Sequence, residues 1–366
     1  MKALGIILAG GNNKRMKELT HKRAIADMPI AGNFRAIDFT LSNMSHSGVG
    51  TVAVIAQYSS RSLNAHLSSS KWWDFGRKQG GLFLFNPTIT PENNDWYRGT
   101  ADAIAQNLDF LYERHEPYVV IASGDGIYKL DYNDVIDFHV EKEADITVVC
   151  KDMPQDADVS RFGVVATDAS GRITDWEEKP VASPLRTIST GVYVIRRRLL
   201  ISLMEQCIEM EWTDFVRDVL MRQKNAKRIM AYRMETYWTN ISNIPAYYEA
   251  NMDFLKKDIR DHFFREYPTV QTKVDDYAPA KYNPGSNVKN SLVANGVILN
   301  GQVQDSILFS KVFVGNGSQV KNSIVMQDAY ISDNVVLEYC IVEAKTNIPA
   351  GTVYKGTPDN IKIVTQ

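Results

Sequence analysis

A glycine pair and two cations follow the first apolar run of the chain. Leu4–Ala9 is long enough for one buried strand, Gly10 and Gly11 end it, and Lys14 and Arg15 lie in the polar loop beyond. A buried strand followed by N–H groups and cations is how α/β proteins bind phosphate, although a tight turn would use the same two glycines. The run G-G-N-N-K-R lacks the G-x-G-x-x-G spacing of dinucleotide-binding domains, which argues against a nicotinamide or flavin cofactor.

Polar side chains also stand at the ends of later apolar runs. In an open parallel sheet, ligands bind beyond the carboxyl ends of the strands, so these side chains are expected to share one site. They would supply N–H donors and cations for phosphates, one carboxylate for a metal and a lysine for a second phosphate, which suits a nucleotide. The residues are Gly10 to Arg15, Gln57, Tyr58, Asp125, Glu178, Lys179 and Ser189. The sequence suggests no Ser-His-Asp or Cys-His arrangement, so a covalent nucleophile is not expected.

The segments that must position these residues alternate between strand-like and helical periods. From residue 1 to about 255 this alternation predicts a parallel sheet covered on both faces. The predicted strands are 4–9, 51–56, 118–122, 145–150 and 187–195, with a hairpin of 163–168 and 172–177. The predicted helices are 36–47, 100–112, 132–142, 214–223 and 243–255, with Asp214 and Asn243 as N-caps. Residues 59–99 are predicted to be irregular.

The pattern changes after residue 255. Residues 256–285 are polar and proline-containing and are interpreted as a linker. Beyond them a Ser/Cys-apolar-apolar motif recurs every 15 to 17 residues, with lone valines and isoleucines about six residues apart between the repeats. A sandwich would also give short strands, but this register favours a parallel β-helix. The predicted domains are therefore 1–255, a linker over 256–285, and a β-helix over 286–366.

Bulk composition excludes several classes of protein. The formal net charge of −2 and the mixed charge pattern argue against a nucleic-acid binder. Three widely spaced cysteines indicate a reducing compartment and suggest neither a disulfide framework nor a zinc site. No run approaches the roughly 20 apolar residues of a membrane span, and the first apolar segment is interpreted as a strand, not a signal peptide. A cytoplasmic protein is expected.

Seven motifs stand in the order found in bacterial ADP-glucose pyrophosphorylases, and the chain resembles that family over nearly its whole length. The resemblance implies an N-terminal Rossmann-like nucleotidyltransferase domain with a mostly parallel sheet and a C-terminal left-handed parallel β-helix. The motifs are L-A-G-G-x-x-x-R (8–15), F-R-A-I-D-F-T-L-S-N (34–43), W-Y-R-G-T-A-D-A (96–103), S-G-D-x-I-Y-K-x-D-Y (123–132), W-E-E-K-P (176–180), S-T-G-V-Y (189–193) and D-F (214–215).

The resemblance also implies a reaction, in which glucose 1-phosphate attacks the α-phosphorus of ATP and pyrophosphate leaves. Such chemistry needs positioning and charge neutralisation, with Mg²⁺ present when nucleotide is bound. By resemblance, the triphosphate faces Gly10, Gly11 and Arg15, with Arg15 also catalytic, and the nucleoside faces Gln57, Gly99 and Thr100. Asp125 is the catalytic carboxylate on the metal. Glu178, Lys179, Ser189 and Asp214 hold the sugar phosphate.

Four departures from the family pattern surround this set. Asn13 and Lys14 replace a glycine and a threonine, Ile25-Ala26 replaces a lysine-proline pair, and Gly126 replaces a histidine. Asn240 replaces the second metal carboxylate, so that one neutral oxygen stands where Mg²⁺ prefers charge.

These departures resemble the GlgD-type subunit of Gram-positive bacteria. The leading hypothesis is a weakly catalytic or non-catalytic regulatory subunit that activates a GlgC-type partner in a heterotetramer of glycogen biosynthesis. The alternatives are an independently active sugar-phosphate nucleotidyltransferase and a homo-oligomer. Because sugar phosphates regulate the family, Lys22, Arg23 and Arg35 are candidates for an effector site, although scattered surface cations would look the same.

Overall fold

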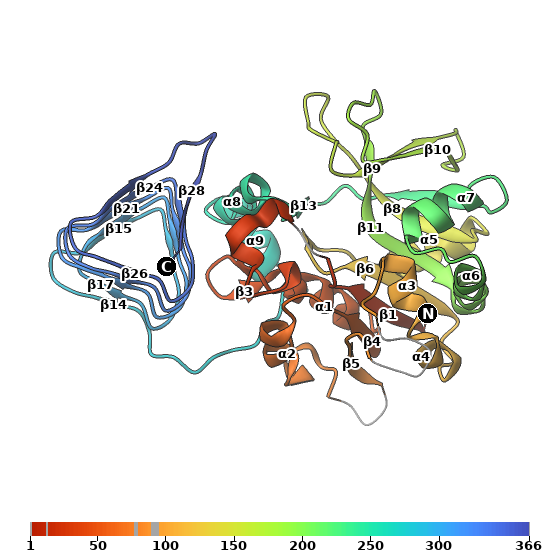
Figure 1. Cartoon of the computed structure of the whole chain (residues 1–366), viewed down its shortest axis with the longest axis horizontal. Coiled ribbons are helices and arrows are strands. Elements are labelled where there is room, and N and C mark those ends of the chain that lie inside the picture. The colour runs from red at the N-terminus through yellow and green to blue at the C-terminus, as the bar shows by residue number, and fades with distance from the viewer. Residues whose placement is uncertain (1, 12–13, 77–79, 89–94, 366) are drawn as a thin grey trace. The chain divides into compact units, whose positions relative to one another are not determined.

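The chain divides into two compact units. The computed structural model describes residues 2–11, 14–76, 80–88 and 95–365 (Figure 1). The first unit comprises the described residues within 1–12 and 40–238, and the second those within 13–39 and 239–366. Helix α1 (Ala36–His46) and strand β13 (Trp238–Asn240) lie where the chain passes between the units.

A nine-stranded sheet forms the centre of the first unit (Figure 1). Its middle is parallel: β1 (Ala3–Leu8) lies between β4 (Thr51–Ile55) and β6 (Tyr118–Ser123), and β5 (Gly81–Phe85) pairs with β4. The other strands are β8 (Ile146–Asp152), β9 (Gly163–Thr167), β10 (Ile173–Glu178), β11 (Thr187–Arg196) and β12 (Ile229–Arg233). Strand β11 runs antiparallel to β6 and β8. The predicted mostly parallel sheet is confirmed, and its strands read as continuous apolar runs because both faces are covered.

Helices pack on this sheet as the apolar periods predict. A single apolar cluster joins one face of the sheet to α3, α4 and α6, while α5 contacts β8, β11 and β12 outside that cluster. The helices of this unit are α2 (Arg61–Leu67), α3 (Thr100–Ala105), α4 (Leu108–Tyr112), α5 (Tyr132–Glu141), α6 (Arg197–Glu209) and α7 (Met221–Gln223). Among the helices of the described ranges, none combines the length and apolar character needed to span a membrane.

Two predictions of local structure are wrong. The helix expected over 100–112 is interrupted between α3 and α4, where the Asn107 side chain donates to the Ala103 carbonyl at 2.8 Å. An asparagine side chain that bonds to the backbone competes with helical hydrogen bonds. The irregular segment predicted over 59–99 contains α2 and the edge strand β5, which lacks the alternation of a half-buried strand.

Both predicted caps are confirmed. Asp214 accepts hydrogen bonds from the backbone N–H groups of Val216 and Arg217, ahead of a π-helical segment (Phe215–Leu220) that continues into α7. Asn243 accepts from Ala246 N–H at the start of α8 (Ile244–Asp253), which carries proline in its first turn. Each cap satisfies N–H groups that a helix start leaves without backbone partners.

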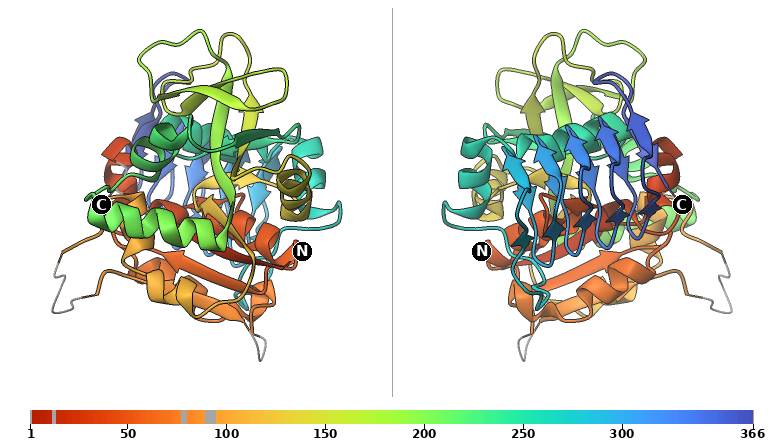
Figure 2. Two further views of the ribbon diagram at one scale, coloured as in Figure 1. Left: turned by 90° about the vertical axis from the view of Figure 1, so that its right-hand side faces the viewer. Right: turned by 90° about the vertical axis from the view of Figure 1, so that its left-hand side faces the viewer.

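A parallel β-helix of three five-stranded sheets forms most of the second unit. Figure 2 shows its coils stacked, with strands of successive coils side by side. The recurring motif falls in register in one sheet, where Leu292 pairs with Ile307, Ile307 with Ile324 and Ile324 with Ile341. The parallel β-helix predicted from the repeats, and the left-handed β-helix implied by the family resemblance, are confirmed.

The three sheets are built from two- and three-residue strands. The first contains β14 (Lys281–Tyr282), β17 (Ile298–Leu299), β20 (Phe313–Val314), β23 (Tyr330–Ile331) and β26 (Asn347–Ile348). The second contains β15 (Asn287–Lys289), β18 (Gln302–Gln304), β21 (Gln319–Lys321), β24 (Val336–Glu338) and β27 (Val353–Lys355). The third contains β16 (Leu292–Val293), β19 (Ile307–Leu308), β22 (Ile324–Val325), β25 (Cys340–Val342) and β28 (Lys362–Val364).

A ladder of serines, of which Ser306 and Ser323 are buried, explains why the motif begins with a small polar residue. The hydroxyl of Ser291 accepts from Ser306 N–H, that of Ser306 from Ser323 N–H, and that of Ser323 from Cys340 N–H, each at 3.0–3.1 Å. Each coil therefore satisfies a backbone donor of the next coil, as a buried N–H group requires.

Two helices and the segment 14–39 complete the second unit. Helix α8 and helix α9 (Lys257–Phe264) contribute to an aromatic cluster of Phe34, Phe39, Phe254, Phe263 and Phe264. Tyr248 of α8 donates its hydroxyl to the Asn322 carbonyl of the β-helix at 2.7 Å. The segment predicted as a linker, 256–285, contains α9 and the first coil strand β14, so the coils begin at Lys281.

Candidate nucleotidyltransferase site

The nucleotide-facing candidates of the first unit lie at the carboxyl ends of β1 and β4. A Cβ atom on Gly10 would lie 3.5 Å from Gln57 Cγ and 3.8 Å from the Ile55 carbonyl, so Gly10 lies beside the end of β4. Gln57 Nε2 donates to the Tyr97 carbonyl at 3.2 Å, two residues before Gly99. Gly11 is exposed and a Cβ there would meet nothing within 4 Å. Gly10, Gln57 and the segment 97–99 are therefore brought together.

Asp125 lies in the turn that follows β6. Its half-buried carboxylate accepts a 2.5 Å hydrogen bond from the Ser123 hydroxyl. Removal from water raises the pKa of the Asp125 carboxyl, while the Ser123 hydrogen bond and the positive charges of Lys179 and Arg161 act in the opposite direction. A carboxylate with a raised pKa gains most from a nearby cation, because a positive charge offsets the cost of its burial.

Side chains of α1 hold this turn in place. Thr40 donates its hydroxyl to the Ser123 carbonyl at 3.1 Å, and the Asn43 amide bonds to both the Tyr128 carbonyl and Leu130 N–H. These contacts explain why the motifs at 34–43 and 123–132 belong to one site. Sequence reasoning assigned no role to Thr40 or Asn43, and their polar character on a buried helix face was the available signal.

Ser189, one of the sugar-phosphate candidates, lies beside Tyr193, with Ser189 Oγ 3.5 Å from the Tyr193 hydroxyl oxygen. The Tyr193 ring packs against Phe215, the residue after Asp214, with the ring centroids 5.4 Å apart. Burial raises the pKa of Tyr193, the Ser189 hydroxyl acts in the opposite direction, and the negative charges of Glu178 and Asp214 raise that pKa further. Tyr193 ends the S-T-G-V-Y motif, but sequence reasoning assigned it no role of its own.

Glu178 and Lys179 form an ion pair at the end of β10. Glu178 Oε1 and Lys179 Nζ are 3.2 Å apart, and the glutamate side chain is 11% exposed while the lysine side chain is 53% exposed. Lys179 adopts a left-handed φ of 52°. The buried carboxylate thus anchors an exposed ammonium group that remains accessible to a phosphate.

A bulge in β11 begins after Ser189 and lies beside the end of β6. The register with β8 shifts between Ser189 and Val192, and Gly191 has a φ of +78°. A Cβ on Gly191 would lie 3.4 Å from Ser123 Cβ, so the bulge lies against the end of β6. Bulges of this kind redirect a side chain at the end of a sheet.

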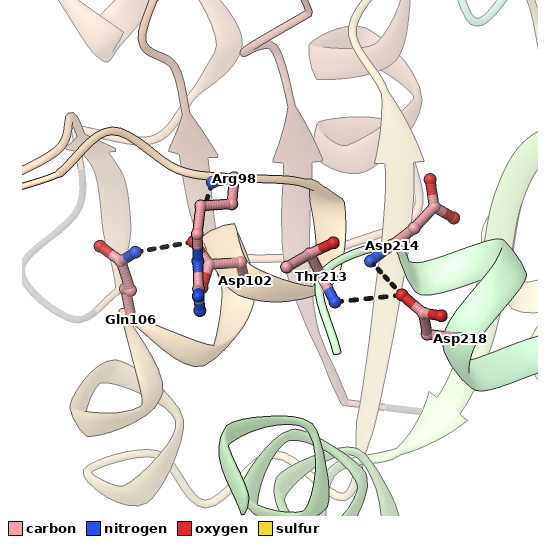
Figure 3. A network of polar contacts seen from close by, with 6 residues as sticks. All are labelled: Arg98, Asp102, Gln106, Thr213, Asp214 and Asp218. Carbon is pink, nitrogen blue, oxygen red and sulfur yellow. Dashed lines mark hydrogen bonds and ion pairs between the residues drawn. The ribbon is translucent and has the colours of Figure 1, made fainter. Parts of the chain in front are cut away.

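The remaining first-unit candidates are Gly99, Thr100 and Asp214, and hydrogen bonds join the segment that carries the first two to the segment that carries the third. Figure 3 shows Asp214 with Thr213 and Asp218 beside Arg98, Asp102 and Gln106. Thr100 Oγ1 accepts from Phe215 N–H at 2.9 Å, and the Thr213 carbonyl accepts from Ala101 N–H at 2.8 Å. A Cβ on Gly99 would lie 2.4 Å from the Thr213 oxygen, a distance that only glycine tolerates.

The other candidates belong to the second unit or lie outside the described residues. Arg15 and Lys22 are exposed, while Arg23 and Arg35 are ion-paired with Glu343 and Asp27, respectively. Asn240 Oδ1 accepts from the Ser242 hydroxyl at 3.1 Å. Asn13 lies outside the described residues.

Among the described residues of the first unit, Asp125 has the chemistry of a Mg²⁺ ligand. Mg²⁺ in nucleotide-processing proteins is commonly held by one or two carboxylates together with substrate phosphates. A half-buried carboxylate with a raised pKa, beside a strand-end glycine, meets that requirement for the protein's share of the ligands. When bound, the ion would neutralise phosphate charge.

Fold and site together define a class. A largely parallel sheet with glycines, a carboxylate and a lysine at its strand ends, joined to a hexapeptide β-helix, is a sugar-nucleotide type of nucleotidyltransferase architecture. Residues 4–257 match the family model described as "Nucleotidyl transferase". Residues 278–357 match the model described as "GlmU-like, C-terminal hexapeptide".

Curated relatives narrow the class. The glucose-1-phosphate adenylyltransferases of Bacillus thuringiensis (strain Al Hakam) and Bacillus anthracis are each 36% identical over 365 residues, covering 97% of this chain and 95% of those proteins. The enzyme of one strain of Bacillus cereus is 35% identical with the same coverage. The chain belongs to the glucose-1-phosphate adenylyltransferase, or ADP-glucose pyrophosphorylase, family, as the motifs indicated.

Proposed function

We propose that this chain is a weakly catalytic or non-catalytic regulatory subunit of glucose-1-phosphate adenylyltransferase. It activates a GlgC-type catalytic partner, in a heterotetramer, for ADP-glucose formation in bacterial glycogen biosynthesis in the cytoplasm. The observation that carries the proposal is a contrast between two sets of family positions. The residues proposed for the sugar phosphate are retained, whereas Asn240 stands at the position of the second metal carboxylate.

The surroundings of two further departures support reduced catalysis. Ile25 and Ala26 are buried apolar side chains at 5% and 0% exposure, where the family pattern has a cation followed by proline. A Cβ on Gly126 would lie 2.9 Å from Tyr128 Cε1, so the backbone at the family's histidine position leaves no room for a side chain. Both losses affect groups that would neutralise or orient phosphates.

The retained residues support binding of ATP and glucose 1-phosphate. Lys179 would attract the sugar phosphate, while Glu178 and Asp214 would accept hydrogen bonds from sugar hydroxyls. Gly10, Gly11 and Arg15 would contact the triphosphate, with Mg²⁺ joining Asp125 to it. A phosphate oxygen of glucose 1-phosphate would then attack the α-phosphorus as pyrophosphate leaves, which requires alignment and charge neutralisation.

An assay of ADP-glucose formation tests the proposal. It compares the purified chain alone, the GlgC-type partner alone, and the mixture. We expect the chain alone to turn over at least about 100-fold more slowly than the mixture, since one missing electrostatic contact at a transition state costs about that much. We also expect the mixture to exceed the partner alone. Robust turnover by the chain alone would contradict the proposed regulatory role.

Robust turnover by the isolated chain would support the second candidate function, an independent sugar-phosphate nucleotidyltransferase. The retention of Asp125 together with Glu178, Lys179, Ser189 and Asp214 favours it. A titration of ATP into the isolated chain separates binding from turnover.

An effector site at Lys22, Arg23 and Arg35 would require anions to compete with Glu343 and Asp27 for the two arginines.

A further inference from the structure

The turn that carries Asp214 is fixed by side-chain oxygens. Five consecutive backbone N–H groups, from Thr213 to Arg217, donate to the side chains of three residues. Thr213 and Asp214 N–H both donate to Asp218 Oδ2, at 3.1 and 3.0 Å. Phe215 N–H donates to Thr100 Oγ1, and the last two N–H groups donate to Asp214 Oδ1. A turn in which every amide has a defined acceptor has little freedom to rearrange.

The Thr213 carbonyl of the same turn bonds to the segment 98–102, which carries Gly99 and Thr100. The Thr213 oxygen accepts from Ala101 and Asp102 N–H at 2.8 and 3.2 Å. The buried Asp102 carboxylate in turn accepts from the Arg98 backbone and guanidinium and from Gln106 Nε2 (Figure 3). We call these two bonded segments, residues 98–102 and 213–218, the clasp.

The Asp218 carboxylate is part of the clasp, but it is directed at backbone N–H groups and not at the positions proposed for the ligands. Figure 3 shows its carboxylate directed at the N–H groups of Thr213 and Asp214, with the Asp214 carboxylate turned away from it. The N–H group of Asp214, helped by that of Thr213 and by Arg222, lowers the pKa of Asp218. Asp218 is therefore ionised at neutral pH, and its charge strengthens both hydrogen bonds.

We propose that Asp218 is a positioning residue that fixes the Asp214 carboxylate for the sugar phosphate, and that the clasp couples this position to the nucleotide-facing Gly99 and Thr100. Nucleotide bound against residues 98–102 restrains the residual motion of the turn, so that less conformational entropy is lost when the sugar phosphate binds and the sugar phosphate binds more tightly. Coupling between two ligands is reciprocal, so the sugar phosphate tightens nucleotide binding by the same factor. The inference rests on the proposed binding of both ligands.

Isothermal titration of glucose 1-phosphate, with and without saturating α,β-methylene ATP and Mg²⁺, tests the coupling. The methylene bridge replaces the bond that transfer would break, so binding is measured without turnover. We expect wild-type protein to bind glucose 1-phosphate at least about fivefold more tightly with the nucleotide analogue present. In Asp218→Ala the two N–H groups lose their acceptor, so we expect about tenfold weaker binding and coupling below about twofold.

Two variants separate positioning from general destabilisation. Asp218→Asn keeps one oxygen that can accept both N–H groups, so we expect binding within about threefold of wild type. Asp168→Ala is the matched control, because Asp168 also accepts two backbone N–H groups, from Ser170 and Arg172, but in the β9–β10 turn. Equal weakening in Asp168→Ala, equal weakening in Asp218→Asn, or unchanged binding in Asp218→Ala would each overturn the proposal.

Hydrogen exchange in the wild-type protein provides a test that needs no variant. The proposal predicts that the nucleotide analogue alone slows amide exchange in a peptide covering residues 213–217. Unchanged exchange there, in protein that binds the analogue, contradicts the coupling even if Asp218→Ala fails to fold. Absence of binding of either ligand by wild type would overturn the proposed binding function and this inference together, whereas binding without coupling would overturn the inference alone.

Discussion

The sugar-phosphate side and the metal side of the candidate site differ in how far they keep the pattern of the family. Glu178, Lys179, Ser189 and Asp214 are all present and held by neighbouring groups, including the ion pair at the end of β10 and the clasp. Of the residues proposed for the metal side, Asp125 remains, whereas Asn240 stands where the family pattern has a carboxylate and Gly126 where it has a histidine. The chain has therefore kept the residues proposed for ligand recognition and lost part of the set proposed for catalysis.

Removing the Lys179 charge should produce the largest effect on the sugar-phosphate side. We expect Lys179→Ala to weaken glucose 1-phosphate binding by roughly 30-fold, since a charge-assisted hydrogen bond contributes about 2 kcal/mol. Binding of the ATP analogue should change by less than about threefold. Isothermal titration measures both, with Lys179→Arg as the control that keeps the charge. Unchanged affinity for glucose 1-phosphate would show that Lys179 is only a surface charge of the hairpin.

Altering the β11 bulge should have a smaller effect on the same side. We expect Gly191→Ala to lower the free energy of unfolding by about 1–2 kcal/mol, because alanine is strained at a φ of +78°. It should also weaken glucose 1-phosphate binding, since the bulge places Ser189. Denaturant unfolding and titration check the two effects. Gly171→Ala, at a φ of +83° in the β9–β10 turn, is the matched control: it should lose stability without losing affinity.

Restoring a carboxylate on the metal side should have a limited effect. We expect Asn240→Asp to raise ADP-glucose formation by the isolated chain by no more than about tenfold, because Ile25 and the glycine loop also differ from the family pattern. Steady-state assays with varied Mg²⁺ measure the change. Full activity from this single substitution would show that the other departures do not limit catalysis.

Removing the Asp125 carboxylate should stabilise the fold slightly. Because burial raises the pKa of Asp125, the folded state favours its protonated form. Its stabilising contribution is present below the pKa of the unfolded chain and is lost as pH rises through the folded pKa, so ionised Asp125 costs stability at neutral pH. We expect Asp125→Asn to raise Tm by about 1–3 °C at pH 7 and to remove Mg²⁺-dependent nucleotide binding. A difference in Tm that does not shrink as pH falls toward 4 would contradict this origin.

Particular elements show how far the sequence predicts the structure. The caps at Asp214 and Asn243 were predictable, because an acceptor before a helical period satisfies local N–H groups. The edge strand β5 was not, because its pairing with β4 depends on a segment distant in sequence. The break after α3 was not predictable either, because it depends on a hydrogen bond of the Asn107 side chain, and the spacing of apolar residues does not indicate such a bond.

The sequence by itself determined the family, the alternation of strands and helices, and the coil register of the β-helix. Each of these depends on local spacing or on ordered motifs, which the linear chain preserves. Only the tertiary structure decided that Asp218 and Thr100 hold the turn that carries Asp214. These relations join residues up to 115 positions apart, so no local pattern encodes them. They arise because every N–H group of a packed turn must find an acceptor.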